Sequence, residues 1–245
     1  MKKFVILLLT AALCLTLAGC GGEAERGTVE ALPPVTTEAV PATETVPATE
    51  TAPAETEDSL GMGTLEGGSY VNSYAGYGVD LDDSWVFVGA QELQDLPDTV
   101  WEAMDGSELA EQMEGVEQFT DFQAESAEKM ASLNLVYSKQ DLSARLAFQI
   151  LSDEEVVDAT LGQKDLMVEA YGKAGIEVTA MEKTAVTFLG RETWALKTTA
   201  KVQGMDYYVL QFFNYRAGAY GLTLTCASFV DDRTEELAGM FYEVN

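Results

Sequence analysis

The stretch of sequence that decides the fold is residues 176–229, IEVTAMEKTAVTFLGRETWALKTTAKVQGMDYYVLQFFNYRAGAYGLTLTCASF. Breaks at Gly190, Gly204 and Gly218 divide it into four segments in which apolar and polar residues tend to alternate. Alternation with a period of two is typical of β-strands, and breaks this short are typical of hairpin turns. The sequence therefore predicts a four-strand antiparallel meander, with strands at residues 176–189, 193–202, 207–215 and 220–229.

The third of these strands is apolar on both faces. Val209 and Phe213 point to one face, while Tyr208, Leu210 and Phe212 point to the other. A strand that is apolar on both faces is normally covered on both, so we expect helices on both sides of the sheet, at least at its centre. The aromatic residues are then interpreted as core. The alternative is that one face lacks a cover and its tyrosines form an exposed interaction patch.

Upstream of the meander, the sequence predicts a long helix. Ser152, with Glu155 three residues on, forms a capping box at its start. The helix is expected to run to about residue 174, either unbroken or interrupted at Gly162, and to stop at Gly175. Residues 142–151 fit both a helical face and strand alternation, so both interpretations stay open.

The remaining elements are read from shorter signals. We expect a β-hairpin over residues 70–81, strands at 85–88, 119–124 and 133–137, and helices at 90–96, 106–113 and 234–242. Pro97 is expected to stop the first of these helices, Asp105 and Glu108 to begin the second, and Asp231-Asp232 to cap the third. The βαβ alternation of a doubly wound fold is missing. The predicted fold is α+β: a mostly antiparallel sheet with helices packed on it, as an α/β/α sandwich.

The first twenty residues have the pattern of a lipoprotein signal. Two lysines precede an apolar run over residues 4–17, which is shorter than the roughly 20 residues that span a bilayer core. The run ends in Leu17-Ala18-Gly19-Cys20, where a small residue precedes the cleavage point and the cysteine thiol takes a diacylglycerol. Two acyl chains hold a protein firmly to a membrane. We therefore predict a lipid anchor on Cys20; the alternative is an ordinary signal peptide with Cys20 a bystander.

The segment that follows Cys20 is predicted to be a disordered stalk. Five of the six prolines lie between residues 21 and 58, and the hexapeptide VPATET occurs at residues 40–45 and again at 46–51. Such a segment cannot bury enough apolar surface to offset the entropy of ordering it. Three parts are therefore expected, listed in chain order: a signal peptide at 1–19, the lipidated cysteine and stalk at 20–67, and one globular α+β domain at 68–245.

The chain is strongly acidic. Its 41 acidic and 14 basic residues give a formal net charge of −27, and removal of the two lysines in residues 1–19 brings it to −29. A chain with this charge repels the phosphates of nucleic acids, so nucleic-acid binding is excluded.

Histidine is absent from the chain. Its absence excludes Ser-His-Asp and Cys-His nucleophile systems and the usual zinc sites. Cys14 is lost with the signal peptide and Cys20 takes the lipid, so Cys226 has no disulfide partner. Cys226 shares a predicted strand face with Leu222 and Leu224, and it is interpreted as a buried structural thiol. No catalytic residue, cofactor site or metal site is assigned.

Enzyme and metal hypotheses rest on carboxylates alone. Asp80 and Asp82 share a strand face, and paired acids carry out glycoside hydrolysis in many enzymes. Asp80, Asp82 and Asp83 together also supply the oxygen ligands that calcium prefers, although their spacing matches no established calcium loop. The acidic runs at 153–155 and 231–232 are explained by helix capping without catalysis.

The opening of the predicted domain resembles a known family. The pattern Tyr70-x-Asn72-x-Tyr74-x-Gly76, with Leu81 and Trp85 following, is similar to the opening hairpin of PsbP-like domains. The chain more closely resembles uncharacterised lipoproteins of Gram-positive anaerobes, through this opening, the strand end at 184–190 and Asp-Arg-Thr at 232–234. The resemblance covers roughly residues 68–245 and implies a non-enzymatic extracytoplasmic binding or accessory domain. The metal sites of the plant family involve histidine, so they are not carried over.

The function predicted from these observations is that of a membrane-anchored lipoprotein on the extracytoplasmic face of the cell membrane. Its domain is expected to bind an envelope protein or a glycan, without a cofactor. Two alternatives stay open: a carboxylate-dependent hydrolase of an extracellular polymer, and a purely structural envelope protein.

Overall fold

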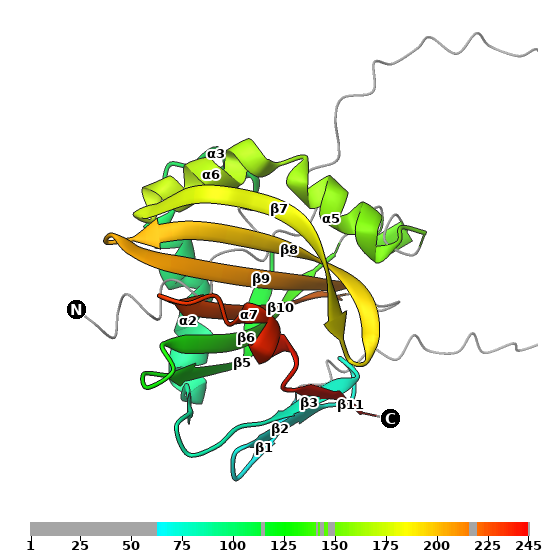
Figure 1. Cartoon of the computed structure of the whole chain (residues 1–245). Helices are drawn as coiled ribbons and strands as arrows, with labels where there is room; N and C mark the ends of the chain where they lie inside the picture. Colours follow the sequence, from blue (N-terminus) through cyan, green and yellow to red (C-terminus); the bar gives the residue numbers. More distant parts are fainter. Residues whose placement is uncertain are drawn as a thin grey trace, which may run out of the picture.

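The computed structural model describes residues 63–113, 116–140, 142, 145–146, 150–215 and 220–244. Within them, a seven-stranded sheet carries helices on one face and a four-stranded sheet on the other (Figure 1). The predicted signal peptide, Cys20 and almost all of the predicted stalk lie outside the described residues. None of the described helices is long and apolar enough to cross a membrane.

The larger sheet has the strand order β4-β5-β6-β10-β9-β8-β7, and all neighbouring strands are antiparallel. Its strands are β4 (Val86–Phe87), β5 (Gln118–Ser126), β6 (Ala131–Lys139), β7 (Ile176–Phe188), β8 (Arg191–Val202), β9 (Met205–Tyr215) and β10 (Tyr220–Phe229). The last four strands are the predicted meander, which the structure confirms.

Two-residue turns set the register of the meander. Leu189 and Gly190 join β7 to β8 with φ of 49° and 73°, and Gln203 and Gly204 join β8 to β9 with φ of 52° and 83°. Positive φ at both central residues matches the twist of a hairpin and favours glycine. The glycine in each turn is therefore the local signal that made these strand ends predictable.

The described helices are α2 (Ala90–Ala103), α3 (Glu108–Gln112), α5 (Asp153–Leu161), α6 (Lys164–Lys173) and α7 (Thr234–Ala238). The capping box of Ser152 and Glu155 at the start of α5 is confirmed. Gly162 ends α5 and separates it from α6, so the interrupted form of the predicted helix is correct. The turn after α6 contains Gly175, with φ of 79°.

The end of α2 and the start of α3 differ from the prediction. The backbone of α2 continues through Pro97 to Ala103. The helix packs on β5 and buries Val100. This burial offsets the loss of the backbone hydrogen bond that proline cannot donate. The cap of α3 is Ser107, whose Oγ accepts from Ala110 N–H at 3.1 Å, so the predicted start at Asp105 is wrong.

The smaller sheet has the order β1-β2-β3-β11. It consists of β1 (Thr64–Glu66), β2 (Ser69–Asn72), β3 (Tyr77–Asp80) and β11 (Phe241–Glu243). The hairpin of β2 and β3 was predicted, but β1 lies in the predicted stalk, so the folded part begins before residue 68. The expected helix over 234–242 ends at Ala238 because Phe241 is buried and β11 pairs with β3.

Each face of the larger sheet has its own cover and its own core. On the helix side, α2 lies over β5, α5 over β8 and β9, and α6 over β7. On the small-sheet side, Tyr77, Val79, Leu237 and Phe241 pack with residues of the large sheet such as Leu222. The α+β class is confirmed, and β9 is covered on both faces as expected. Helices cover only one face broadly, because the apolar face of the opening hairpin needs a partner and occupies the other.

Residues 142–151 are described only in part. Leu142, Arg145 and Leu146 are helical, in agreement with the helical interpretation of this stretch. The other residues between 141 and 149 lie outside the described residues.

Candidate functional site

A β-bulge in β5 turns one carboxylate toward the small-sheet side. The register of β5 on β6 shifts between Thr120 and Phe122, so Asp121 is the extra residue of the bulge. A bulge bends its strand and re-aims a side chain. Asp121 is 8% exposed and is the one buried acid among the side chains that the structure describes.

The carboxylate of Asp121 accepts hydrogen bonds from three groups at the N-terminal end of the described chain. Tyr70 Oη donates to Oδ2, and Asn72 Nδ2 donates to the same oxygen at 2.6 Å. The backbone N–H of Gly63 lies 3.1 Å from each carboxylate oxygen. Asp121 therefore fastens β2, and the residue that precedes β1, to the larger sheet.

Asn72 extends this arrangement to β6. Its Nδ2 also donates to Tyr137 Oη at 2.7 Å, and its Oδ1 accepts from Ala75 N–H at 2.7 Å. Burial, and then the neighbouring Asp121, raise the pKa of the Tyr70 hydroxyl, so this phenol stays protonated and donates. We call Gly63, Tyr70, Asn72, Asp121 and Tyr137 the carboxylate cluster.

The carboxylate cluster holds two sheets together. Its hydrogen bonds join β2 to β5 and β6, and its tyrosine and asparagine side chains are at most 2% exposed. Sequence reasoning missed Asp121, and it placed Tyr70 and Asn72 only in the pattern of the opening hairpin. The available signal was a single acid between Thr120 and Phe122 in a strand that is otherwise largely uncharged.

A second set of buried polar side chains lies on the helix side of the larger sheet. Gln123, Asn134, Thr225 and Gln211 are cross-strand neighbours on β5, β6, β10 and β9. They form a continuous line, the polar row, which ends at Leu196 of β8. The four side chains are 0%, 1%, 4% and 1% exposed, so this polar line occupies a buried sheet face.

Several buried polar atoms on the same face, or just beyond the end of β6, have no hydrogen-bond partner. They are Oε1 of Gln123 and Gln140, Oγ of Ser138 and Oγ1 of Thr198. Gln123 uses only its Nε2, which donates to Glu125 at 2.6 Å. Native structures rarely leave buried polar atoms without a partner, and those that remain are often completed by water or a ligand.

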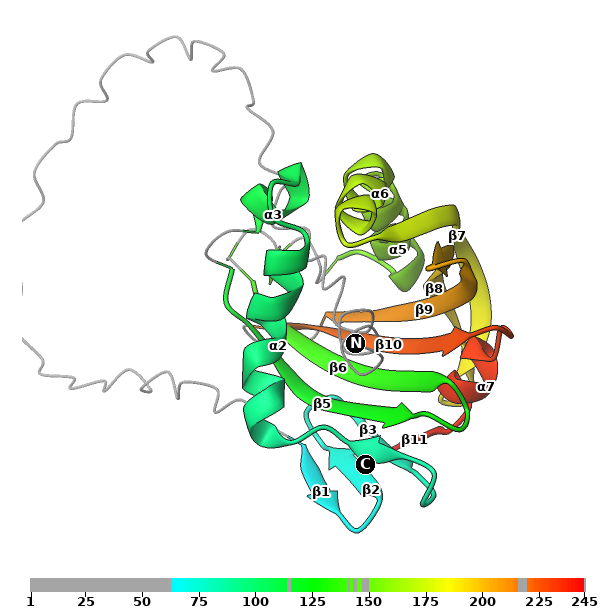
Figure 2. The ribbon, with the colours of Figure 1, turned by 90° about the vertical axis from the view of Figure 1, so that its left-hand side faces the viewer.

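The polar row lies between the two groups of helices. Figure 2 shows α2 at one end of the larger sheet and the α5–α6 pair at the other, with β6 and β10 between them. These central strands carry Asn134 and Thr225. Sequence reasoning missed the polar row, because polar residues that alternate with apolar ones indicate a solvent-facing strand surface.

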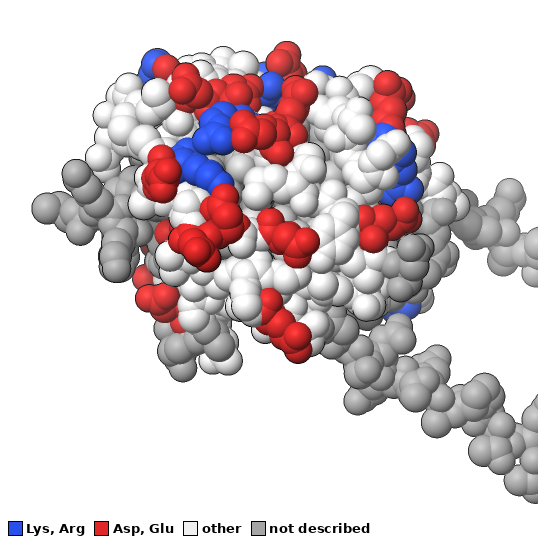
Figure 3. Space-filling model, turned by 60° about the horizontal axis from the view of Figure 1, so that its bottom comes forward, with Lys and Arg blue, Asp and Glu red and all other residues white. Residues whose placement is uncertain are grey.

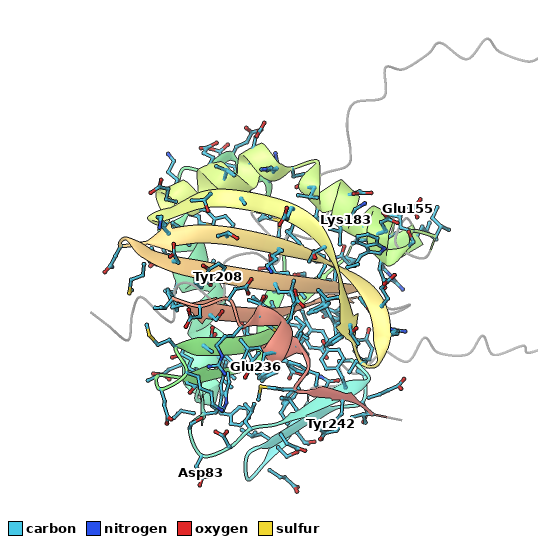
Figure 4. The ribbon with its side chains drawn as sticks, in the orientation of Figure 1. Asp83, Glu155, Lys183, Tyr208, Glu236 and Tyr242 are labelled. Carbon is cyan, nitrogen blue, oxygen red and sulfur yellow. The ribbon has the colours of Figure 1, made fainter. Side chains whose placement is uncertain are left out.

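The acids singled out from the sequence do not come together. Asp80 accepts from Ser69 Oγ at 2.6 Å, whereas Asp82 pairs with Lys129 Nζ at 2.7 Å. Asp83, labelled in Figure 4, lies exposed in the turn that follows β3. Across the described part of the chain, no group of three or more His, Cys, Asp or Glu is arranged to hold a metal ion. The structure therefore does not assemble the calcium site considered for these three residues.

Cys226 is a buried thiol on the strand face of Leu222 and Leu224, as predicted. It is 0% exposed, and burial raises the pKa of its thiol well above the ordinary range. Only the thiolate is a strong nucleophile. The predicted burial of Cys226 is confirmed.

We expect the Cys226 thiol to react at least about a hundredfold more slowly in the folded protein than in 8 M urea. The measurement is the rate of reaction with dithiobis(nitrobenzoic acid), in a chain carrying Cys14→Ser and Cys20→Ser. A Thr187→Cys variant, which places a thiol on an exposed position of β7, is the control and should react rapidly when folded. Equal rates for Cys226 in the folded and unfolded chain would contradict its burial.

Acidic side chains are spread over the surface, and the few cations lie among them. Figure 3 shows many Asp and Glu side chains on one face, with Lys and Arg next to some of them. Lys183 of β7, which is labelled in Figure 4, pairs with Glu154 and Asp158 of α5 at 2.8 and 2.7 Å. The same ammonium lies 5.0 Å from the ring centroid of Trp194. These contacts fix α5 to the edge of the sheet.

Comparison with known proteins finds a structural neighbour but no family. No family model matches the chain, and no curated protein matches its sequence. Among solved structures, the solution structure of cyanobacterial PsbP (CyanoP) from Synechocystis sp. PCC 6803 is similar, with a TM-score of 0.39 and 12% sequence identity. The alignment covers 71% of this chain and 91% of that chain. The α+β assignment itself rests on the sheet order and registers given above.

Proposed function

We propose that this protein is a lipoprotein, held to the extracytoplasmic face of the cell membrane by a diacylglycerol on Cys20. The observation that carries the proposal is Leu17-Ala18-Gly19-Cys20 at the end of the apolar run. The proline- and threonine-rich residues between Cys20 and Gly63 then act as a tether. Asp121 holds the N–H of Gly63, which gives the tether a fixed point of entry into the fold.

The folded part acts as a binding or accessory module, for an envelope glycan or an envelope protein. Buried polar atoms without hydrogen-bond partners support this half of the proposal: Oε1 of Gln123 on β5, and Oγ of Ser138 and Oε1 of Gln140 at and beyond the end of β6. Stability alone does not require such atoms, since unpaired buried polar groups are destabilising. A site prepared for a ligand accounts for them.

The anchor is tested by metabolic labelling of the full chain with an alkyne fatty acid in an expressing bacterium. We expect the unmodified chain to carry the label and to sediment with membranes. Cys20→Ser should abolish the label, because serine has no thiol for the thioether. Cys14→Ser is the matched control and should keep both label and membrane association. Full labelling of the Cys20→Ser chain would refute the anchor.

A further inference from the structure

The strand β7 is an outer strand of the larger sheet, and among the described strands it pairs only with β8 (Figure 1). In an antiparallel pair, successive residues point their backbone groups alternately toward the partner strand and away from it. Phe188 and Arg191 close a two-residue turn, so Phe188 points its groups toward β8. Lys183, Ala185 and Thr187 alternate with Phe188 and point their N–H and C=O groups away from β8. A row of such groups is a template for pairing with another strand.

The two halves of this edge differ in their protection against strand addition. In the N-terminal half, a register shift between Val178 and Ala180 marks a bulge, and Lys164 Nζ donates to the outward C=O of Met181 at 3.3 Å. Bulges and covered backbone groups both hinder the pairing of an edge. In the C-terminal half, the described residues supply no partner for the outward backbone groups of residues 183–187. We call residues 183–187 the open edge.

Charged side chains do not shield the open edge. Lys183 is its one charged residue, and the ammonium is held against α5 by Glu154 and Asp158. Ala185 and Thr187 are small and exposed. Edge strands of monomeric proteins usually carry a charge or a proline that prevents pairing. The open edge is long enough for a strand and lacks such a device.

The open edge is complementary to a second copy of itself. A two-fold axis through Ala185 pairs Lys183 with Thr187 of the second copy, so no like charges lie opposite each other. Each outward backbone group of the open edge then faces an outward group of the second copy. A shift toward the N-terminus would bring in Met181, whose C=O already accepts from Lys164, or would place the two copies of Lys183 opposite each other.

The same register brings opposite charges together on the small-sheet side. It places Glu182 opposite Phe188 of the second copy, and the neighbour of that Phe188 on β8 is Arg191. The Cα atoms of Glu182 and this Arg191 are then two strand spacings apart, about 10 Å, which their extended side chains can span. Both residues are exposed, and Arg191 makes no ion pair with any residue that the structure describes. Two-fold symmetry forms this contact twice.

We propose that the open edge of β7 is a self-association site. Two copies of this chain join their larger sheets there into one continuous antiparallel sheet, across a two-fold axis at Ala185. The contact is small and the acidic chains repel each other elsewhere, so the dimer is weak and reversible. The inference goes beyond the proposed function: it involves neither the lipid on Cys20 nor a bound ligand, so it can fail or hold independently of both.

A cysteine at the two-fold axis tests the register. The background is the full chain carrying Cys14→Ser and Cys20→Ser, which retains only the buried Cys226. On oxidation with copper phenanthroline, Ala185→Cys should form a disulfide-linked dimer, because the Cα atoms of such a pair lie about 5.5 Å apart, within the range of a disulfide.

Thr187→Cys is the matched control for this disulfide. Thr187 is exposed on the same face as Ala185, but in the proposed register its two copies lie more than about 13 Å apart. This variant should therefore remain monomeric under the same oxidation. Absence of a dimer with Ala185→Cys, or an equal yield of dimer with Thr187→Cys, would overturn the proposal.

Charge reversal tests the contact without a disulfide. In sedimentation equilibrium, the mass of the same background chain should rise above the 26.5 kDa monomer as its concentration approaches about 1 mM. Arg191→Glu should lower the association constant about tenfold, because both symmetry-related ion pairs become repulsions. Glu182→Arg added to Arg191→Glu should restore most of the association. A monomeric mass at every concentration, or no recovery in the double variant, would overturn the proposal.

Discussion

Asp121→Ala is expected to lower the free energy of unfolding by about 3 kcal/mol. Alanine removes the acceptor shared by Tyr70 Oη, Asn72 Nδ2 and the N–H of Gly63. The two side-chain donors are buried and would lose a partner that water cannot readily replace. Asp121→Asn should lose less, because the amide oxygen still accepts from part of the cluster.

The measurement is urea unfolding of the full chain, followed by tryptophan fluorescence. Asp83→Ala is the control, since this aspartate is exposed in the turn that follows β3. Its unfolding midpoint should be close to that of the unmodified chain. If the midpoint of Asp121→Ala were also close to that of the unmodified chain, the carboxylate cluster would not be holding the two sheets together.

Tyr137→Ala is expected to be more damaging still, with a loss of about 4 kcal/mol. The side chain of Tyr137 is 0% exposed at the contact between the two sheets. Its ring stacks on Phe119 with centroids 5.0 Å apart and meets Tyr220 edge-on at 6.3 Å. Alanine leaves a cavity among these rings and removes the acceptor for Asn72.

Tyr137→Phe separates the ring from its hydroxyl. Phenylalanine keeps the stacked ring and removes the hydroxyl that accepts from Asn72, so we expect a loss of about 1 kcal/mol. Both variants are compared by the same urea titration. If Tyr137→Phe were as unstable as Tyr137→Ala, the hydroxyl rather than the ring would account for the loss of stability. That result would contradict a stabilising role for the ring contacts with Phe119 and Tyr220.

The C-terminal half of the fold was predictable because its signals are local. Alternation within residues 176–229, glycine in the two-residue turns and the capping box at Ser152 each specify structure within a few residues. The helix at 90–96 was predicted too short because its stabilising contacts, such as those of Val100, come from a distant strand. Phe241 likewise leaves the expected last helix because β3 is available as a partner.

The carboxylate cluster and the polar row were not predictable, because both depend on contacts between strands that are distant in the sequence. Gln123, Asn134 and Thr225 alternate with apolar residues, so each of their strands alone looks like one with a solvent-facing side. Gln211 is a single polar residue in a strand that is apolar on both faces. Only the assembled sheet shows that these four positions are adjacent and buried. Asp121 required the bulge, whose position depends on the register between β5 and β6. The PsbP-like opening did contain Tyr70 and Asn72, but not their shared partner.

The small sheet determines which face of the larger sheet lies next to the predicted tether. Both of its edge strands lie near the ends of the described chain, β1 at one end and β11 at the other. A tether that enters at Gly63 therefore reaches the small-sheet face of the larger sheet, whereas α2, α5 and α6 lie on the other face (Figures 1 and 2). The attachment point and the buried polar row therefore lie on opposite faces of the larger sheet. A neighbour that contacts the tethered side would therefore meet the small sheet rather than α2, α5 and α6.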